Sequence, residues 1–474
     1  MRNLTLLTDL YQLTMMNGYY KNDKANEIAV FDLFFRQNDT ISYSISAGLE
    51  QAIDYVLNLH FDDEDISYLK GLNLFEEDFL NYLKDFKFTG DIYAVEEGTP
   101  IFPNEPILIV KAPLIQAQFI ETALLNIINH QTLIATKASK ICSVTKGEVM
   151  EFGLRRAQAP DAGIYGARAA VIGGCSGTSN VIAGKMFDLK VKGTHSHSWV
   201  MSFPTELEAF EKYAELYPDA CLLLVDTYDT LKSGIPNAIK VFKELIAKGH
   251  KPLGVRLDSG DLAYLSKMAR KMFDDEGLFD VKICASNDLD EYLIQSLTQQ
   301  GAKIDTWGVG TRLITSENMP SLGGVYKLSA LIKDGVEYPK IKLSNNTIKI
   351  TNPCFKNLYR LYDKDTKMAI ADLITLKDEV IDEGKPITLY HPIDNWKKTE
   401  VSNYYIEPLL KEIILNGKLV YKMPKVDEIV KRKKEKLSHF WDEYKRIERP
   451  HIYKVDLSNK LYEIKKEMMD SVIG

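Results

Sequence analysis

The middle of the chain repeats one pattern, in which a short continuous apolar run is followed by a stretch with helical periodicity. The clearest runs are 221–225 (CLLLV), 253–257 (LGVRL) and 281–285 (VKICA), within a series that begins at 149 and closes at 304–307. Continuous apolar strands separated by helices are typical of a parallel sheet covered on both faces. The number and even spacing of the units favour a (β/α) barrel over an open sheet.

The segments on either side of this series lack the strand–helix repeat. Early strands around 28–35, 90–95 and 106–110 are followed by a long apolar helix, or a broken pair of helices, from Leu114 to about Lys146. A second β-rich stretch follows Gly323. The predicted fold is therefore α/β, with an N-terminal α+β domain over 1–148 completed by about 323–400, a catalytic (β/α) barrel over 149–322, and a charged, helical C-terminal extension over 401–474.

Composition excludes several classes of protein. The net charge of −7 argues against a general nucleic-acid binder or a membrane-surface binder. No uninterrupted apolar run reaches the length of a membrane span, and Asp9 interrupts the N-terminus before a signal peptide develops. The five cysteines are widely spaced without a C-x-x-C motif, which is typical of a reduced protein. We therefore expect a cytoplasmic location.

Polar residues follow nearly every predicted strand of the central series. In a parallel barrel, functional side chains sit at these carboxyl ends. Arginine suits bidentate phosphate contacts, a Gly-flanked turn such as Gly308–Arg312 can hold a phosphate, and the Asp residues could hold Mg²⁺ through water on a diphosphate. Asp261 can equally cap a helix. The residues in question are Arg155, Arg156, Thr194, His197, Asp226, Arg256, Asp258, Ser286, Asn287, Gly310 and Thr311.

Two histidines follow Thr194 at the end of one such strand. On an extended chain His195 and His197 share a face. They are compatible with an ordinary polar loop start, while a zinc site would need a third ligand, and no other His or Cys cluster lies nearby in the sequence. With the surrounding arginines they leave two reactions open. One is phosphoryl transfer with His197 as the nucleophile, and the other is displacement at a sugar that bears a diphosphate.

Five motifs, in this order and spacing, resemble the nicotinate phosphoribosyltransferase family over nearly the whole chain. They are Leu7–Met15 (LTDLYQLTM), Glu151–Gln158 (EFGLRRAQ), Gly193–His197 (GTHSH), Gly254–Asp261 (GVRLDSGD) and Gly308–Thr311 (GVGT). The resemblance implies the irregular barrel of that family. It also implies a reaction in which nicotinate and 5-phosphoribosyl 1-diphosphate give nicotinate mononucleotide and diphosphate. The reaction would be coupled to ATP hydrolysis, as an entry to NAD.

The resemblance also implies roles for individual residues. His197 would be the transient phosphohistidine, with Asp226 and Asp258 in the catalytic set. Tyr11, reaching in from a neighbouring subunit, would bind nicotinate together with Thr194 and Arg256. The phosphoribosyl diphosphate would be bound by Arg155, Asn287, Gly310 and Thr311. Expected partners are Mg²⁺ (or Mn²⁺), ATP as a co-substrate, and a second copy of the chain in a homodimer with shared sites, without a dedicated protein metal site.

One position departs from the family pattern. Cys354 stands in the loop 352–356 where family members often carry glycine, although Lys356 is present. Two other functions remain open from the sequence. A nicotinamide-specific phosphoribosyltransferase would use the same scaffold, and a non-catalytic sensor of phosphate ligands would use a decayed barrel. The intact His197, Arg256 and Asp258 argue against decay. A barrel aldolase is disfavoured because no strand-end lysine stands out.

Overall fold

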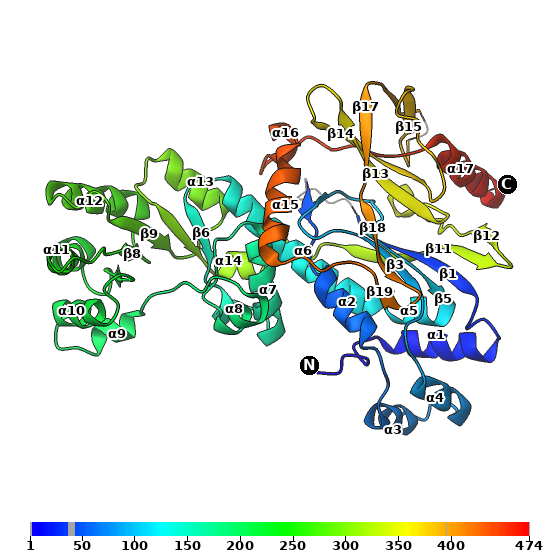
Figure 1. Cartoon of the computed structure of the whole chain (residues 1–474), viewed down its shortest axis with the longest axis horizontal. Coiled ribbons are helices and arrows are strands. Elements are labelled where there is room, and N and C mark those ends of the chain that lie inside the picture. Colours follow the sequence, from blue (N-terminus) through cyan, green and yellow to red (C-terminus); the bar gives the residue numbers. More distant parts are fainter. Residues whose placement is uncertain (1, 37–42, 395, 474) are drawn as a thin grey trace. The chain divides into compact units, whose positions relative to one another are not determined.

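A computed structural model describes residues 2–36, 43–394 and 396–473 (Figure 1). The chain divides into two compact units. One is discontinuous and is built from Met1–Leu133 and Ser321–Gly474, and the other is central and comprises Ile134–Pro320. The division falls inside helix α6 (Glu121–Ser143) rather than at the predicted boundary of 148.

The central unit contains the parallel sheet that the apolar runs predicted. Its strand order is β6-β10-β9-β8-β7, and every neighbouring pair is parallel. Burial of both faces explains the apolar character, since the side chains of Leu223, Val255 and Ile283 have no exposed surface. The strands are β6 (Glu148–Glu151), β7 (Leu222–Leu224), β8 (Gly254–Leu257), β9 (Lys282–Ser286) and β10 (Thr306–Val309).

The two edge strands of this sheet, β6 and β7, are not joined by a continuous ladder of hydrogen bonds. Thr178 forms single parallel bridges to Glu151 and to Val191. On the other side, the Thr194 hydroxyl donates to the Leu222 carbonyl, and the Leu224 N–H donates to His195 Nε2 over 3.2 Å. The described residues therefore form a five-stranded ladder, and the segment 178–195 joins its edges through isolated contacts. A regular barrel ladder is not formed there.

Helices connect the strands of the central unit, and Figure 1 shows them in green outside the sheet. Several begin at a side chain that accepts a hydrogen bond from a backbone N–H of the first turn, as Thr205 and Asp290 do. Asp261 is such a cap, accepting from the Tyr264 N–H over 3.0 Å. The helices are α7 (Pro160–Gly173), α8 (Val181–Phe187), α9 (His197–Met201), α10 (Glu206–Leu216), α11 (Ile235–Ala247), α12 (Leu262–Asp275), α13 (Glu291–Gln299) and α14 (Thr311–Ile314), with the short turns η1 (Leu154–Arg156) and η2 (Thr230–Gly234).

The discontinuous unit is built on two larger sheets. In the first, β1 (Ile28–Phe35) pairs with β11 (Gly324–Lys333), so the chain after 323 completes the N-terminal layer as predicted. This sheet also contains β3 (Asp91–Val95), β5 (Leu108–Pro113), β12 (Val336–Pro339), β18 (Leu410–Leu415) and β19 (Lys418–Leu419). The second contains β13 (Lys356–Asp363), β14 (Ala369–Leu376), β15 (Ile387–Tyr390), β16 (Lys398–Val401), β17 (Tyr404–Pro408) and β20 (Val455–Leu457), and β2 (Ser44–Ile45) pairs separately with β4 (Pro100–Ile101).

The helices of this unit come mostly from its N-terminal part. The apolar stretch after Leu114 is a broken pair, α5 (Leu114–Phe119) and α6, interrupted at Ile120. The others are α1 (Leu10–Lys21), α2 (Leu49–Leu57), α3 (Asp63–Gly71), α4 (Glu77–Lys84), α15 (Val426–Ser438), α16 (Asp442–Lys445) and α17 (Asn459–Ile473), with the turn η3 (Thr347–Lys349). No helix in the described parts of the chain is both long and apolar enough to cross a membrane.

The prediction of a helical extension over 401–474 is wrong for its first part. Strands β17, β18 and β19 occupy 404–419 and extend both sheets of the discontinuous unit. Strand β18 pairs with β3, with Leu410 opposite Val95, and it buries Ile413 and Ile414. The charged residues between these apolar positions suggested a helix, but pairing with a strand far away in the sequence decides the conformation.

The loop with the unusual cysteine is built around a buried lysine. Cys354 has a φ of 75°, a left-handed conformation that explains why glycine is common there. Lys356 Nζ donates to the carbonyls of Asn352, Pro353 and Cys354 and pairs with Asp32 over 2.7 Å. Because Lys356 is buried and fully engaged, it stabilises the loop rather than offering its charge to a phosphate.

Candidate active site

The carboxyl ends of the five parallel strands carry the polar residues singled out from the sequence. Because parallel strands end at one edge, residues that are far apart in the sequence lie close together there. Each strand supplies one position, namely Arg155 after β6, Asp226 after β7, Asp258 after β8, Asn287 after β9 and Gly310 after β10.

The Asp226 carboxylate is held by hydrogen bonds from the segment that carries Asp258. Asp226 Oδ2 accepts from the Asp258 N–H over 2.9 Å and from Ser259 Oγ over 2.6 Å. Its other oxygen, Oδ1, is buried and has no hydrogen-bond partner among the described residues. A buried carboxylate oxygen is costly to leave unpaired, so this atom fits a cation or a water bound to one.

His197 is held between two side chains of this edge. It is the first residue of α9, and its side chain is 40% exposed. Nδ1 lies 3.1 Å from Thr227 Oγ1, and Nε2 lies 3.8 Å from Asp258 Oδ2. Because both ring nitrogens face a fixed partner, the ring orientation is set, as nucleophilic or proton-transfer chemistry requires.

His195 has a different environment, and the prediction that the two histidines share a face is wrong. The chain turns into α9 after Ser196, and His195 is only 8% exposed. Its Nε2 accepts from the Leu224 N–H, its Nδ1 lies 3.3 Å from the Ser196 carbonyl, and its ring meets Tyr213 edge-on at 4.7 Å. The ring is therefore neutral, with the proton on Nδ1, and it belongs to the closure of the sheet.

We expect His195 to make the protein less stable as the pH decreases. Burial lowers the pKa of His195 from its ordinary 6.5 to about 4. Between these values the unfolded chain binds more protons than the folded one, so the free energy of unfolding decreases as pH falls from 6.5 towards 4. Urea unfolding of wild type and His195→Gln across this range should show a shallower pH dependence in the variant. Equal slopes would assign the acid sensitivity to other groups.

Arg256 and Thr194 both take part in the contacts of the 194–195 segment. Arg256 Nη2 donates to the His195 carbonyl over 3.2 Å, whereas its Nε is buried without a hydrogen-bond partner in the described parts of the chain. A buried guanidinium with a free N–H is suited to bind an anion. The Thr194 hydroxyl donates to the Leu222 carbonyl, so it is engaged within the protein.

The remaining candidate residues lie in turns after the strands. Arg155 is exposed in η1. Asn287 and Asp288 both have positive φ values, 99° and 43°, and such local strain is concentrated at functional sites. Gly310 precedes Thr311 at the start of α14, and a Cβ on Gly310 would lie 3.3 Å from the Phe152 carbonyl. The neighbouring Arg312 is paired with Asp290 instead.

Tyr11 belongs to the discontinuous unit, where it lies on α1 and is 47% exposed. A basic cluster that sequence reasoning missed lies in the same unit. Burial, Lys342 and Arg36 lower the pKa of Lys327, whereas Glu121 raises it, and Glu121 also raises the pKa of Tyr11. Arg36 Nε is buried without a hydrogen-bond partner in the described residues. Arg36 and Lys327 are brought together by the β1–β11 pairing, which no local pattern in the sequence reveals.

No group of three or more His, Cys, Asp or Glu side chains in the described residues is arranged to hold a metal ion by itself. The unpartnered oxygen of Asp226 instead suits an ion that brings most of its ligands from water and a phosphorylated substrate.

Comparisons with known proteins cover nearly the whole chain. Family models match residues 6–129 (nicotinate phosphoribosyltransferase N-terminal domain), 148–363 (nicotinate phosphoribosyltransferase family) and 355–465 (the C-terminal domain). A nicotinate phosphoribosyltransferase of Bacillus subtilis is 48% identical over 99% of this chain and 96% of its own length. One from Caenorhabditis elegans is 36% identical over 97% of this chain and 92% of its own.

A solved structure agrees with this assignment. The crystal structure of human nicotinic acid phosphoribosyltransferase superposes with a TM-score of 0.87 and 29% identity, covering 97% of this chain and 99% of the human chain. The motifs at the strand ends, the family models and this fold agree, and the chain belongs to the nicotinate phosphoribosyltransferase family.

Proposed function

We propose that this protein is a nicotinate phosphoribosyltransferase that couples nicotinate mononucleotide synthesis to ATP hydrolysis through a phosphohistidine at His197, in the salvage of nicotinate for NAD. One juxtaposition carries the proposal. His197 faces Asp258, beside the unpartnered oxygen of Asp226 and the free N–H of Arg256. Together these groups offer a nucleophile, a cation-binding carboxylate and an anion-binding guanidinium at one sheet edge.

Arg256 would bind the nicotinate carboxylate, because its free Nε–H is the buried cationic donor at this edge without a partner among the described residues. Arg155, Asn287, Gly310 and Thr311 would hold the phosphoribosyl diphosphate. Thr194 would shape the nicotinate pocket through its backbone, since its hydroxyl is engaged. Mg²⁺ or Mn²⁺, held by Asp226 and Asp258 through water, would neutralise charge on the departing diphosphate.

In the ATP half-reaction, a ring nitrogen of His197 attacks the γ-phosphorus. An N–P bond forms, the bond to the bridging oxygen breaks, and ADP leaves. Asp258, 3.8 Å from Nε2, keeps the ring oriented and stabilises positive charge on it. The phosphorylated ring adds a charge of about −2 at the edge, so neighbouring donors reorganise around it. Water then cleaves the N–P bond and returns His197 to its free form.

Product analysis tests the proposal directly. Purified protein is incubated with Mg²⁺, phosphoribosyl diphosphate and either nicotinate or nicotinamide, with and without ATP. We expect nicotinate mononucleotide, diphosphate and ADP, with more product when ATP is present. Preferential use of nicotinamide would favour the amide-specific enzyme, and ligand binding without turnover would favour a sensor.

We further propose a homodimer in which the discontinuous unit of one chain completes the active site of the other. Support comes from Tyr11 and Lys327, which share Glu121 as a neighbour, and from Lys342 and Arg36, which lie near Lys327. An exposed aromatic ring beside several cations is what a bound pyridine and its phosphates need from a second side of a site.

Mixing inactive variants tests the sharing of sites. We expect Tyr11→Ala/Lys327→Ala and His197→Ala homodimers each to lose ATP-coupled synthesis. After subunit exchange, half of the dimers are hybrids with one intact site, so coupled activity should recover to about a quarter of wild type. Exchange is verified with a mass-tagged chain. Verified hybrids that stay inactive would show that each chain builds its own site.

A further inference from the structure

The discontinuous unit contains a groove whose lining includes none of the residues proposed for the active site. It has a volume of about 840 Å³ and is lined by residues 102–104, 347–348, 391–394, 396–399 and 449–456. A volume of this size falls in the range of small-molecule sites. The lining comes from distant parts of the chain, including the loop before the edge strand β16 and the segment that leads into β20.

The groove is positively charged in an acidic protein. Two carboxyl groups line it, and each lies near a lysine of the same lining. Asp394 is paired with Lys397 over 2.5 Å, and Asp456 is only 4% exposed, with a pKa that burial raises and that His391 and Lys454 lower. Lys398 and Arg449 have no carboxylate partner among the described residues. The permanent cations of the lining are Lys397, Lys398, Arg449 and Lys454, against a net charge of −7 for the whole chain.

The same groove presents a large apolar surface to solvent. Trp396 is 79% exposed and Ile452 is 68% exposed. Lys397 Nζ lies 5.0 Å from the centre of the Trp396 ring, so a cation sits beside the aromatic surface. His391 Nδ1 accepts from the Ile393 and Asp394 N–H groups, which leaves Nε2–H of the neutral ring as a donor. A flat apolar surface, a donor and clustered cations match a planar base attached to a phosphate.

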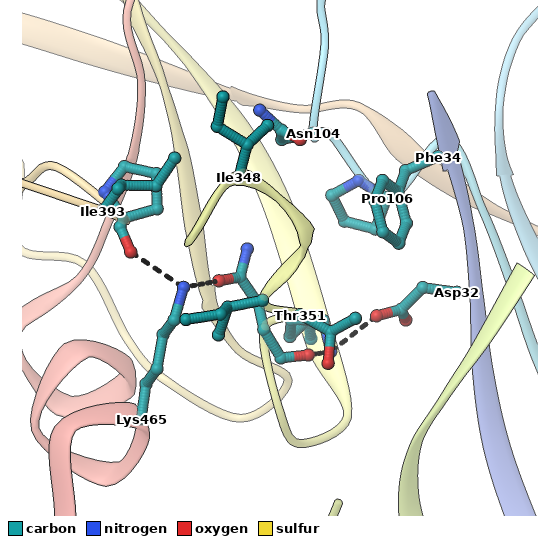
Figure 2. A pocket seen from close by; sticks show the side chains of 12 residues that line it. Asp32, Phe34, Asn104, Pro106, Ile348, Thr351, Ile393 and Lys465 are labelled. Atoms are coloured by element: carbon teal, nitrogen blue, oxygen red, sulfur yellow. Dashed lines mark hydrogen bonds and ion pairs between the residues drawn. The ribbon is translucent and has the colours of Figure 1, made fainter. Parts of the chain in front are cut away.

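A smaller pocket continues behind the groove and shares Asn104, Ile348, Pro392 and Ile393 with it. Figure 2 shows Lys465 of α17 pointing into this region beside Ile393. Lys465 is buried, and its Nζ donates to two neutral oxygens, Asn352 Oδ1 and the Pro392 carbonyl, each at 2.8 Å. The Asp32–Lys356 pair on the far side is neutral overall. Lys465 therefore adds positive potential behind the groove wall.

From these observations we infer that the groove is a binding site for a nucleoside phosphate, built from residues other than those proposed for the active site. The base would lie against Trp396 and Ile452, and the phosphate against Lys398 and Arg449. An acidic peptide would use the cations but has no need of an exposed indole and a groove of this volume. The overall negative charge of the chain disfavours a nucleic acid.

Trp396 provides a local readout in the full-length protein. Adenosine 5′-monophosphate, NAD⁺ and inorganic phosphate are titrated separately against tryptophan emission, and the signal of Trp396→Phe is subtracted to isolate Trp396. We expect saturable quenching by at least one of the two nucleotides. Lys398→Ala/Arg449→Ala should weaken that binding about tenfold or more, because two charge-assisted contacts are lost.

Two controls separate this site from others. Lys364→Ala/Lys418→Ala removes two exposed lysines of the same unit outside the groove, and Arg256→Ala alters the active site instead. Neither should change the Trp396 signal. The inference is overturned if neither nucleotide gives saturable quenching, if the Lys398/Arg449 variant binds as tightly as wild type, or if phosphate alone binds as tightly as the nucleotides.

Discussion

His197→Ala is expected to abolish nicotinate-dependent ATP hydrolysis and the acid-labile phosphate on the protein, while slow ATP-independent transfer continues. The imidazole is the proposed nucleophile, and it lies between Thr227 and Asp258 at the strand edge; alanine has no group that could replace it. We expect coupled hydrolysis to fall by about three orders of magnitude or more, as for other removed nucleophiles. Transfer should persist because, under the proposal, Arg155 and a bound divalent cation would still stabilise the departing diphosphate.

The measurement is labelling with γ-³²P-ATP, followed by acid treatment and product analysis. Ser198→Ala, an exposed neighbour on the same short helix, is the matched control and should label normally. His195→Gln keeps an acceptor for the Leu224 N–H and should also label. If the label survived in His197→Ala and disappeared in His195→Gln, the phosphate would be carried by His195, and our assignment to His197 would be wrong.

Arg256→Ala is expected to impair nicotinate far more than nicotinamide. Its unpartnered Nε–H is placed to bind a carboxylate, which nicotinamide lacks. Losing the partner of a buried anion costs about 2–4 kcal/mol, which corresponds to roughly 30- to 800-fold in kcat/KM for nicotinate. Arg256→Lys keeps the charge but not the planar fork, so it should recover only part of the loss.

Steady-state kinetics with both bases measure this effect, and thermal unfolding checks that the bond from Arg256 to the His195 carbonyl is not the whole cause. Equal losses with nicotinate and nicotinamide would indicate a general structural role. Unchanged nicotinate kinetics in a folded variant would exclude Arg256 from substrate recognition.

Much of the central unit could be read from the sequence because its signals are local. A continuous apolar run such as 221–225 reports a strand that is buried on both faces, wherever its partners are. A residue directly after such a strand, such as Asp226 or Asp258, must lie at the carboxyl edge of the sheet. The cap at Asp261 is likewise local, since its side chain bonds to a backbone N–H three residues later.

The sequence did not show in the same way which distant segments of the chain pair with each other. The charged pair Lys411 and Glu412 is compatible with a helix until β3 is available as a partner, and only the folded chain supplies it. Lys327 lies on β11 and Arg36 follows β1, so their proximity depends on the β1–β11 pairing, and the groove around Trp396 is assembled from segments far apart in the sequence. Such contacts depend on which surfaces meet, and spacing along the chain does not encode that.

The two histidines of Gly193–His197 separate the contributions of sequence and tertiary structure. The sequence alone determined that a strand-end segment carries Thr194, His195 and His197 beside phosphate-suited arginines. The family resemblance favoured His197, and only the tertiary structure supplies a physical difference between the rings, because His195 is buried against Tyr213 and bonded to the Leu224 N–H, whereas His197 remains accessible beside Asp258. The difference is burial, which depends on α10 and β7 packing around one ring and not the other, and which suppresses the charge of His195.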